Sequence, residues 1–316
     1  MRRGAPTCGR LTALAALTAA GVLAGGSAGA PGAAQAQGAA EVTHVGIVVR
    51  DAAASAAAYA ALAGVAPAAV EAARGDEPAR VARVRLANVA VDLIEPTGPV
   101  GGAYRDFLDT RGQGVHHLAI RTSGGARRID LTARLGLLVE LVPAAAGDGP
   151  PGGGAAGPHG AGPGADLDRP ACITHLGIAV RDIRAARRAL LDVVGVEPTP
   201  IREFQAARGQ GEFTAFNLQN VSIELLQQVG DGTGTYADFL DRHGQRVHHI
   251  GMHFRDAGDS LDMPAQAERL ERHGGVLAAD GGSHAYFDLR PGLGLLVEAL
   301  APAASDAIYP HPHAAP

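Results

Sequence analysis

Arg246-Val247-His248-His249-Ile250-Gly251-Met252-His253-Phe254 is the stretch that decides the fold. It is short, apolar apart from its histidines, and predicts a β-strand. Side chains alternate between the two faces of a strand, so one face carries His248, Ile250, Met252 and Phe254, and the other carries His249, Gly251 and His253. A histidine beside a glycine, on a face with room, predicts a metal ligand that opens onto a cavity. For one such histidine alone, an ordinary polar residue near a strand end is the commoner explanation.

The same pattern, a histidine followed two places later by Gly or Ala, begins three further predicted strands. They are residues 173–180 with His175 and Gly177, residues 43–49 with His44 and Gly46, and residues 115–120 with His117 and Ala119. Because the pattern is repeated at the start of four predicted strands, a metal ligand is favoured over an ordinary polar residue near a strand end.

The chain contains two copies of one module. Residues 144–170 are rich in Gly, Pro and Ala, lack apolar periodicity and predict a linker between a first module at 42–143 and a second at 172–301. The stretches 103–117 and 235–249 match along their length. The offset is nearly constant, at 131 positions from His44 to His175 and 132 both from Asp92 to Glu224 and from His117 to His249.

Each module repeats a unit of strand, helix, and two or three strands. In the second module we expect a helix from Asp182, as N-cap, to about Gly195, strands near 213–218 and 222–227, a helix at 264–273, and strands at 285–289 and 295–300. From Glu140 to Glu298 the offset is 158, so the second unit of the first module is 26 residues shorter. This loss removes its helix, and we expect the uncovered sheet face to be covered by the other module or left partly open.

The N-terminus predicts export. Residues 1–36 place three arginines before an apolar run at 11–22 and a small-residue exit at Ala34-Gln35-Ala36, which is typical of a removed signal peptide and indicates a periplasmic or extracellular protein. The apolar run is too short and too rich in Gly and Ala for a stable membrane span. Arg2-Arg3 leaves both the general and the twin-arginine export routes open. Residues 302–316 predict a flexible tail.

Charge and cysteine content narrow the possible partners. The formal net charge is -5, and the sequence has no basic run outside the extreme N-terminus, which argues against a nucleic-acid partner and for a small molecule. Removal of Cys8 with the signal leaves Cys172 alone, so no intramolecular disulfide can form. Cys172 precedes a buried strand and predicts a core residue, not a nucleophile.

These motifs, with Ile223-Glu224-Leu225-Leu226 and Gly294-Leu295-Leu296-Val297-Glu298, resemble the vicinal oxygen chelate (VOC) superfamily, most closely its glyoxalase I and methylmalonyl-CoA epimerase branch. The resemblance implies an α+β fold in which paired βαβββ units curve into a cup and hold a divalent metal with four side chains. It implies that the ligands in the second module are His175, Glu224, His249 and Glu298. The positions for a weaker site in the first module are His44, Asp92, His117 and Glu140.

Two imidazoles and two carboxylates suit Mn, Fe, Co, Ni or Zn, with open positions for a substrate. By the resemblance, the metal polarises a carbonyl while Glu298 or Glu224 removes the proton on the adjacent carbon, giving an enediolate. This predicts an isomerase, epimerase or lyase that acts on a small carbonyl compound. We expect a weaker first site because Asp92 is one methylene shorter than Glu and the shortened unit supports Glu140 less well.

Two other functions remain open. An extradiol ring-cleaving dioxygenase would use His175, His249 and Glu298 on iron, but Glu224 would then occupy a position that oxygen or substrate needs. A sequestering protein of the bleomycin-resistance type would need no metal, and the His and Glu residues argue against it. His253 and Tyr286 are candidates for the cavity wall, and the modules could pair within one chain or in a homodimer.

Overall fold

The structure is a computed structural model that describes residues 40–73, 77–98, 102–143, 170–205, 209–230, 234–256 and 259–302. The predicted export signal, nearly all of the predicted linker and most of the predicted tail therefore lie outside the described residues. Within the described ranges, no helix is both long enough and apolar enough to cross a membrane.

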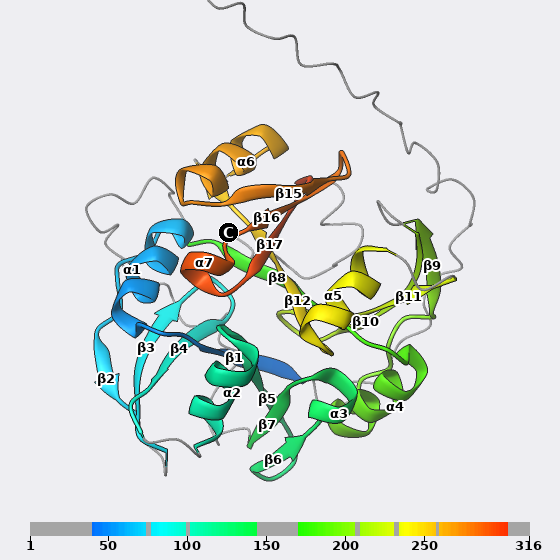
Figure 1. Cartoon of the computed structure of the whole chain (residues 1–316), viewed down its shortest axis with the longest axis horizontal. Helices are drawn as coiled ribbons and strands as arrows, with labels where there is room; N and C mark the ends of the chain where they lie inside the picture. The colour runs from blue at the N-terminus through cyan, green and yellow to red at the C-terminus, as the bar shows by residue number, and fades with distance from the viewer. Residues whose placement is uncertain are drawn as a thin grey trace, which may run out of the picture. The chain divides into compact units, whose positions relative to one another are not determined.

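The first module is a seven-stranded mixed sheet in the order β2-β3-β4-β1-β5-β7-β6 (Figure 1). Its two units meet where β1 pairs antiparallel with β5, and each of these strands pairs in parallel with the last strand of its own unit, β4 or β7. The elements are β1 (Glu41–Val48), α1 (Ala52–Ala63), β2 (Val70–Ala72), β3 (Ala79–Arg85), β4 (Ala90–Pro96), α2 (Ala103–Arg111), β5 (Gly114–Thr122), β6 (Arg127–Asp130), α3 (Thr132–Leu135) and β7 (Leu138–Pro143).

The second module repeats this plan in an eight-stranded sheet, in the order β15-β16-β17-β12-β8-β11-β10-β9. The short strands β13 and β14, which follow β12 in the chain, pair with each other in a separate two-stranded sheet. The elements are β8 (Cys172–Ala179), α4 (Ile183–Val194), β9 (Arg202–Gln205), β10 (Gln210–Asn217), β11 (Ser222–Val229), α5 (Thr235–His243), β12 (Arg246–His253), β13 (Arg255–Asp256), β14 (Asp259–Ser260), α6 (Met263–Arg272), β15 (Val276–Asp280), β16 (His284–Asp288), α7 (Arg290–Leu293) and β17 (Leu296–Leu300). Two tandem modules of paired units are the predicted α+β fold.

The main helices of the second module begin and end where their sequence signals predict. The Asp182 carboxylate accepts the Ala185 N–H and caps α4, and Gly195 ends that helix in the left-handed conformation, which glycine adopts without strain. Asp262 caps α6 in the same way. The two edge strands β9 and β15 and the one-turn helices α3 and α7 were not predicted, because they are too brief to show periodicity.

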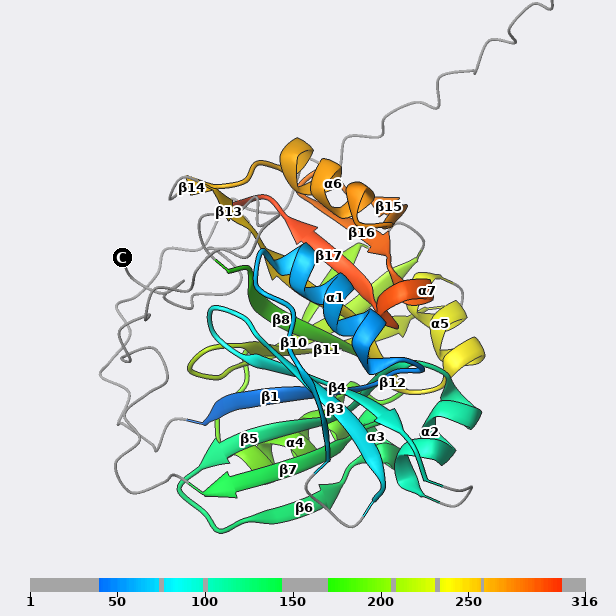
Figure 2. The ribbon, with the colours of Figure 1, turned by 90° about the vertical axis from the view of Figure 1, so that its left-hand side faces the viewer.

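The prediction that the second unit of the first module lacks its helix is confirmed, and the second module covers the sheet there. Residues 123–126, all described, join β5 to β6 without a helix. α4 of the second module packs against α3 of the first (Figure 2). Leu135 and Val139 belong to the same apolar core as Ile183 and Leu190. One core therefore runs through both modules.

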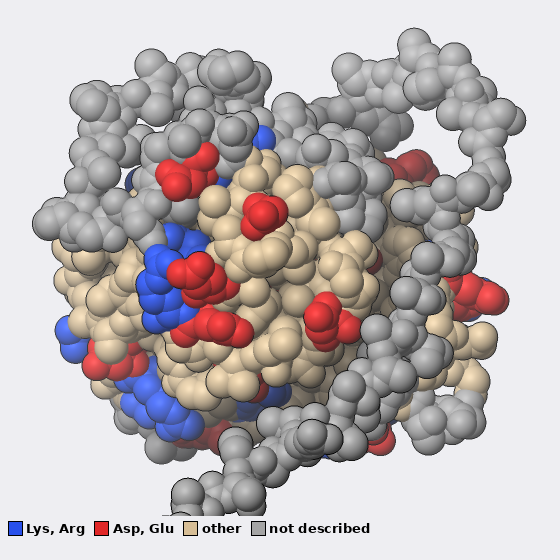
Figure 3. All heavy atoms as spheres, turned by 90° about the horizontal axis from the view of Figure 1, so that it is seen from above, with Lys and Arg blue, Asp and Glu red and all other residues tan. Residues whose placement is uncertain are grey.

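The helix that only the second module has, α6, contacts the first module. Its buried Arg269 donates hydrogen bonds of 2.8 Å to the carbonyl oxygens of both Leu62 and Ala61, in the last turn of α1. The Gly64 N–H also donates to the Ala61 carbonyl, at 3.4 Å, and the guanidinium adds a shorter bond there and complements the helix dipole. On the face above α6, seen in Figure 3, basic and acidic side chains lie next to one another.

Two equivalent asparagines mark an approximate two-fold relation between the modules. The Asn88 side-chain amide donates to the Asn220 carbonyl at 2.7 Å, and the Asn220 amide donates to the Asn88 carbonyl at 2.7 Å. Reciprocal contacts of this kind are what a two-fold interface produces. The modules therefore pair within one chain.

The buried side chain of Arg246 also crosses between the modules. It donates to the carbonyl oxygens of Arg111 at 2.8 Å and Gln113 at 3.1 Å. Burial, with the nearby charges of Arg111 and Arg290, lowers the pKa of Arg246 to about 10. The guanidinium nevertheless stays charged at neutral pH.

The histidine pair departs from strict strand alternation. The register of β12 against β8 shifts between Val247 and His249, which is a β-bulge, and β5 shows the same shift at the equivalent position. The Nδ1 atoms of His248 and His249 lie 2.9 Å apart, so the two rings share one side of the sheet. The prediction that His248 shares the face of Ile250 is therefore wrong, because alternation does not hold across an extra residue.

Candidate metal centre

The four predicted ligands of the second module come from four neighbouring strands. Glu298 lies on β17, His249 on β12, His175 on β8 and Glu224 on β11, and these strands are adjacent in the sheet in that order. All four residues are buried. The topology thus places side chains that are up to 123 positions apart in the sequence on one small patch of the sheet.

Their reactive atoms converge. The Nε2 atoms of His175 and His249 lie 2.9 Å apart, and Oε2 of Glu298 lies 2.7 Å from the first and 3.3 Å from the second. Oε2 of Glu224 lies 3.9 Å from Nε2 of His249. His175, Glu224 and His249 each offer one ligand atom within 4.8 Å of the others. The set predicted from sequence is therefore brought together.

A glycine at the centre of each cross-strand row makes this convergence possible. Gly177 pairs with Glu224 on one side and His249 on the other, and Gly251 pairs likewise with His175 and Glu298. A Cβ on Gly177 would overlap the ring of His249, and one on Gly251 would overlap the ring of His175. The repeated His-x-Gly motif therefore has a steric cause, because only glycine leaves room for the histidine ring of the neighbouring strand.

Neighbouring residues orient both imidazoles. Thr174 Oγ1 lies 3.0 Å from Nδ1 of His175, and Nδ1 of His248 lies 2.9 Å from Nδ1 of His249. Each ring is thus held at Nδ1, with Nε2 directed at the common point, as outer partners of metal-binding histidines do. Burial, and next His249, hold the pKa of His248 well below its usual range, so His248 is neutral at physiological pH.

Electrostatics favour a charged Glu298 beside neutral tyrosines. Burial raises the pKa of Glu298, but the adjacent His249 and His175 lower it more, and the net effect holds this pKa well below its usual range. Burial raises the pKa of both Tyr236 and Tyr286, whose hydroxyl oxygens lie 3.4 Å apart, so both stay protonated. The Tyr286 ring lies 5.1 Å from that of His249. Tyr286 was a predicted wall residue, whereas Tyr236 was not singled out from the sequence as one.

This donor set fits a divalent transition metal. Imidazole nitrogens bind such ions at about 2.0–2.1 Å, so two of them at right angles around one ion lie about 3 Å apart. The His175 and His249 nitrogens have this separation. Two neutral nitrogens and two carboxylates match the ligand preferences of Mn, Fe, Co, Ni and Zn.

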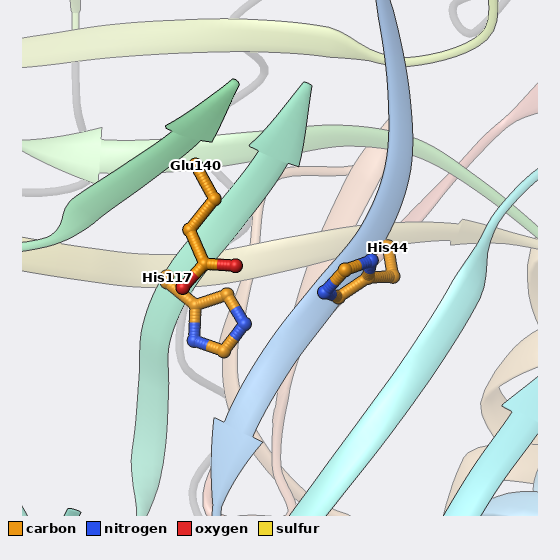
Figure 4. Close-up of side chains that lie close together, drawn as sticks. All are labelled: His44, His117 and Glu140. Atoms are coloured by element: carbon orange, nitrogen blue, oxygen red, sulfur yellow. The ribbon is translucent and has the colours of Figure 1, made fainter. Parts of the chain in front are cut away.

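The first module assembles a similar but altered cluster. Figure 4 shows His44 of β1, His117 of β5 and Glu140 of β7 directed toward one another, and their ligand atoms lie within 4.8 Å. Oδ2 of Asp92 lies 3.8 Å from Nε2 of His44. The expectation that the shortened unit would support Glu140 poorly is therefore wrong, because β7 pairs with β5 along its length.

Both carboxylates of the first cluster are already paired with arginine. Arg83 holds Asp92 through two hydrogen bonds of 2.6 Å, and Arg128 holds Oε1 of Glu140 through bonds of 2.9 and 2.6 Å. Neither arginine was predicted from the sequence. The offsets between the modules align Arg83 with Ala215 and Arg128 with Tyr286. An arginine in the first module thus stands where the second has an uncharged residue, and this difference could have pointed to both.

A cavity adjoins the cluster, and Cys172 was predicted as a core residue. A cavity of about 480 Å³ between the modules includes His249 in its wall, together with four arginines and one acid; they are Arg50, Arg111, Arg246, Arg290 and Asp288. Burial raises the pKa of the Cys172 thiol to about 11, so the thiol is protonated and unreactive at neutral pH, as predicted for a core residue.

Comparisons with known proteins agree with this fold. The model of the Glyoxalase/Bleomycin resistance protein/Dioxygenase superfamily matches residues 43–154 and 174–290. The chain therefore belongs to this superfamily, that of the vicinal oxygen chelate fold. No curated protein matches the chain significantly.

One solved structure supports the same fold. A mutant of 4-hydroxymandelate synthase from Streptomyces coelicolor has a TM-score of 0.54 at 14% identity, covering 82% of this chain and 91% of its own. Methylmalonyl-CoA epimerase from Mycobacterium tuberculosis has a TM-score of 0.34 at 22% identity, covering 43% of this chain and 91% of its own. A fusion of a xylose isomerase-like TIM barrel with 4-hydroxyphenylpyruvate dioxygenase has a TM-score of 0.46 at 12% identity, covering 82% of this chain and 48% of its own. At 14% identity the likeness to the 4-hydroxymandelate synthase mutant concerns the fold alone.

Proposed function

We propose that the second module is a divalent-metal-dependent isomerase, epimerase or lyase that acts on a small carbonyl compound. The observation that carries the proposal is the convergence of two imidazole nitrogens and a carboxylate oxygen, from three adjacent strands, to within 3.3 Å of one another. Four buried polar residues on apolar strands would otherwise cost several kcal/mol of folding free energy. A shared ion offsets that cost.

His175, Glu224, His249 and Glu298 would hold the ion, which would act as a Lewis acid toward the substrate carbonyl. One of the two glutamates accepts the proton from the carbon next to that carbonyl. Tyr236 and Tyr286 stay neutral beside the site and help to exclude water. The arginines of the neighbouring cavity favour a substrate that carries a carboxylate or phosphate. Residues 1–36 support export, which N-terminal sequencing of the secreted protein would test.

Proton exchange with solvent tests the reaction class directly. The purified protein, loaded with Mn²⁺ or Co²⁺ in D₂O, would be incubated with methylmalonyl-CoA and with the hemithioacetal of methylglyoxal and glutathione. We expect deuterium to enter the carbon next to a carbonyl with at least one of them, and His249→Ala to abolish the exchange. Absence of exchange with both compounds would count against the proposal.

The same preparation separates the alternatives. Oxygen uptake with catechol after loading with Fe²⁺ would indicate a ring-cleaving dioxygenase. Tight ligand binding that His249→Ala leaves unchanged, without turnover, would indicate a sequestering protein. Separate Glu224→Gln and Glu298→Gln variants identify the proton acceptor, because the acceptor variant loses exchange while it still binds the ligand.

A further inference from the structure

The two candidate centres differ at matched positions of their sheets. In the first module, Arg83 pairs in register with Asp92, and Arg128 pairs with Glu140. In the second module, the residues that pair with Glu224 and Glu298 are Ala215 and Tyr286. Each carboxylate of the first centre thus faces an arginine at a position where the second centre has an uncharged residue.

The arginines do for these carboxylates what an ion would otherwise do. Arg83 occupies both oxygens of Asp92 with two parallel hydrogen bonds of 2.6 Å, which is the strongest geometry available to an arginine and a carboxylate. Arg128 places two donors on Oε1 of Glu140. Two fixed positive charges therefore balance two negative charges, and a divalent ion would have to displace or face them.

A third difference lies beneath the histidine. His44 pairs in register with Ala119, whereas His175 pairs with Gly251. The methyl group of Ala119 takes up space that Gly251 leaves for the ring of His175. Consistent with this, the side chain of His44 is 17% exposed, but that of His175 is fully buried. The first histidine is thus less deeply seated than its counterpart.

We infer that in the first module the guanidinium groups of Arg83 and Arg128 take the place of a divalent ion, so that this centre is closed by internal charge and binds no metal. The inference rests on the proposed function only in expecting one ion per chain in the second module. It explains why His44, Asp92, His117 and Glu140 stay together: the arginines neutralise the carboxylates and keep the cluster folded.

Metal stoichiometry tests this inference in the full chain. Each variant would be dialysed against Co²⁺, and the bound metal would be measured by plasma mass spectrometry and by the visible spectrum of Co²⁺. We expect one equivalent in the wild type, none in His249→Ala and one in His117→Ala. Loss of an equivalent in His117→Ala would overturn the inference, because the first centre would then hold an ion.

A second set of variants tests the arginines themselves, in the His249→Ala background where the second site is disabled. Arg83→Ala, Ala119→Gly and Arg128→Tyr together give the first centre the residues that the second module has there. We expect this chain to gain one equivalent of Co²⁺, and Ala119→Gly alone to gain none. Both arginine side chains are about half exposed, but their removal leaves the buried Asp92 carboxylate without its partner, so circular dichroism must confirm that the chain still folds.

The outcomes separate this inference from the proposed function. If the wild type binds no ion but the three-residue exchange gains one, the proposed function fails and the inference stands. If the exchange gains none in a folded chain, or Ala119→Gly alone gains one, the arginines are not what excludes the ion and the inference fails. The converse change, Ala215→Arg with Tyr286→Arg, should remove the ion from the second centre without unfolding it.

Discussion

The imidazole ring of His249 occupies the space above Gly177, the residue directly across the β8–β12 pair, and leaves none for a Cβ there. Gly177→Ala should therefore push the ring away from His175 and Glu298. We expect a loss of metal affinity of at least about 10-fold, with overpacking costing about 1–3 kcal/mol of stability.

The measurement is Co²⁺ titration together with chemical denaturation. Gly125→Ala is the matched control, because a Cβ there meets no atom within 4 Å and the residue does not have a positive φ. An affinity loss equal in both variants would contradict the steric explanation.

The same His–Gly relationship shows how far sequence alone could reach. The pattern of histidine, one residue, then glycine singled out His175, Gly177, His249 and Gly251, and the resemblance to the VOC superfamily added both glutamates. The histidines could be recognised because the packing of each ring against a glycine leaves a local sequence motif on each strand. Sequence could not show which glycine lies under which histidine, since that depends on the register between β8 and β12.

What sequence analysis missed depends on similar cross-strand relations. The bulge at His248 is invisible to an alternation rule that assumes a regular ladder. Arg83 and Arg128 looked like ordinary exposed charges, and only the register of β3 with β4 and of β6 with β7 places them on Asp92 and Glu140. Comparing the two modules at every aligned position, instead of only at the ligands, would have singled them out.

The hydroxyl of Thr174 holds Nδ1 of His175 at 3.0 Å, so Thr174 is a positioning residue for the metal centre. Thr174→Val keeps the shape but removes this hydrogen bond, and we expect metal affinity to fall about 10-fold. Thr174→Ser restores the hydroxyl and should recover most of the affinity. If Val and Ser variants bind Co²⁺ equally well, the hydroxyl has no orienting role.

The two glutamates should differ in their contribution to metal affinity. Oε2 of Glu298 lies 2.7 and 3.3 Å from the two imidazole nitrogens, whereas Oε2 of Glu224 lies 3.9 Å from that of His249. We expect Glu298→Gln to weaken Co²⁺ binding by at least about 100-fold and Glu224→Gln by about 10-fold. Isothermal titration of both variants checks the order, and the reverse order would contradict this assignment of the inner ligand.

Arg269 should be the most important single contact between α6 and the first module. Its guanidinium is buried and donates to the last-turn carbonyls of α1 at Leu62 and Ala61, and it also lies 5.6 Å from the ring centre of Phe254. Arg269→Ala removes both of these charge-assisted hydrogen bonds, so we expect a loss of about 2–3 kcal/mol in the free energy of unfolding. Arg272, on the same helix, is the control: its ion pair with Glu268 is exposed, and Arg272→Ala should change stability by less than about 0.5 kcal/mol. Urea denaturation of the two variants measures the difference, and equal stabilities would show that capping of α1 by the second module contributes little. A cooperative single transition is expected in each case, because the continuous core couples the two modules.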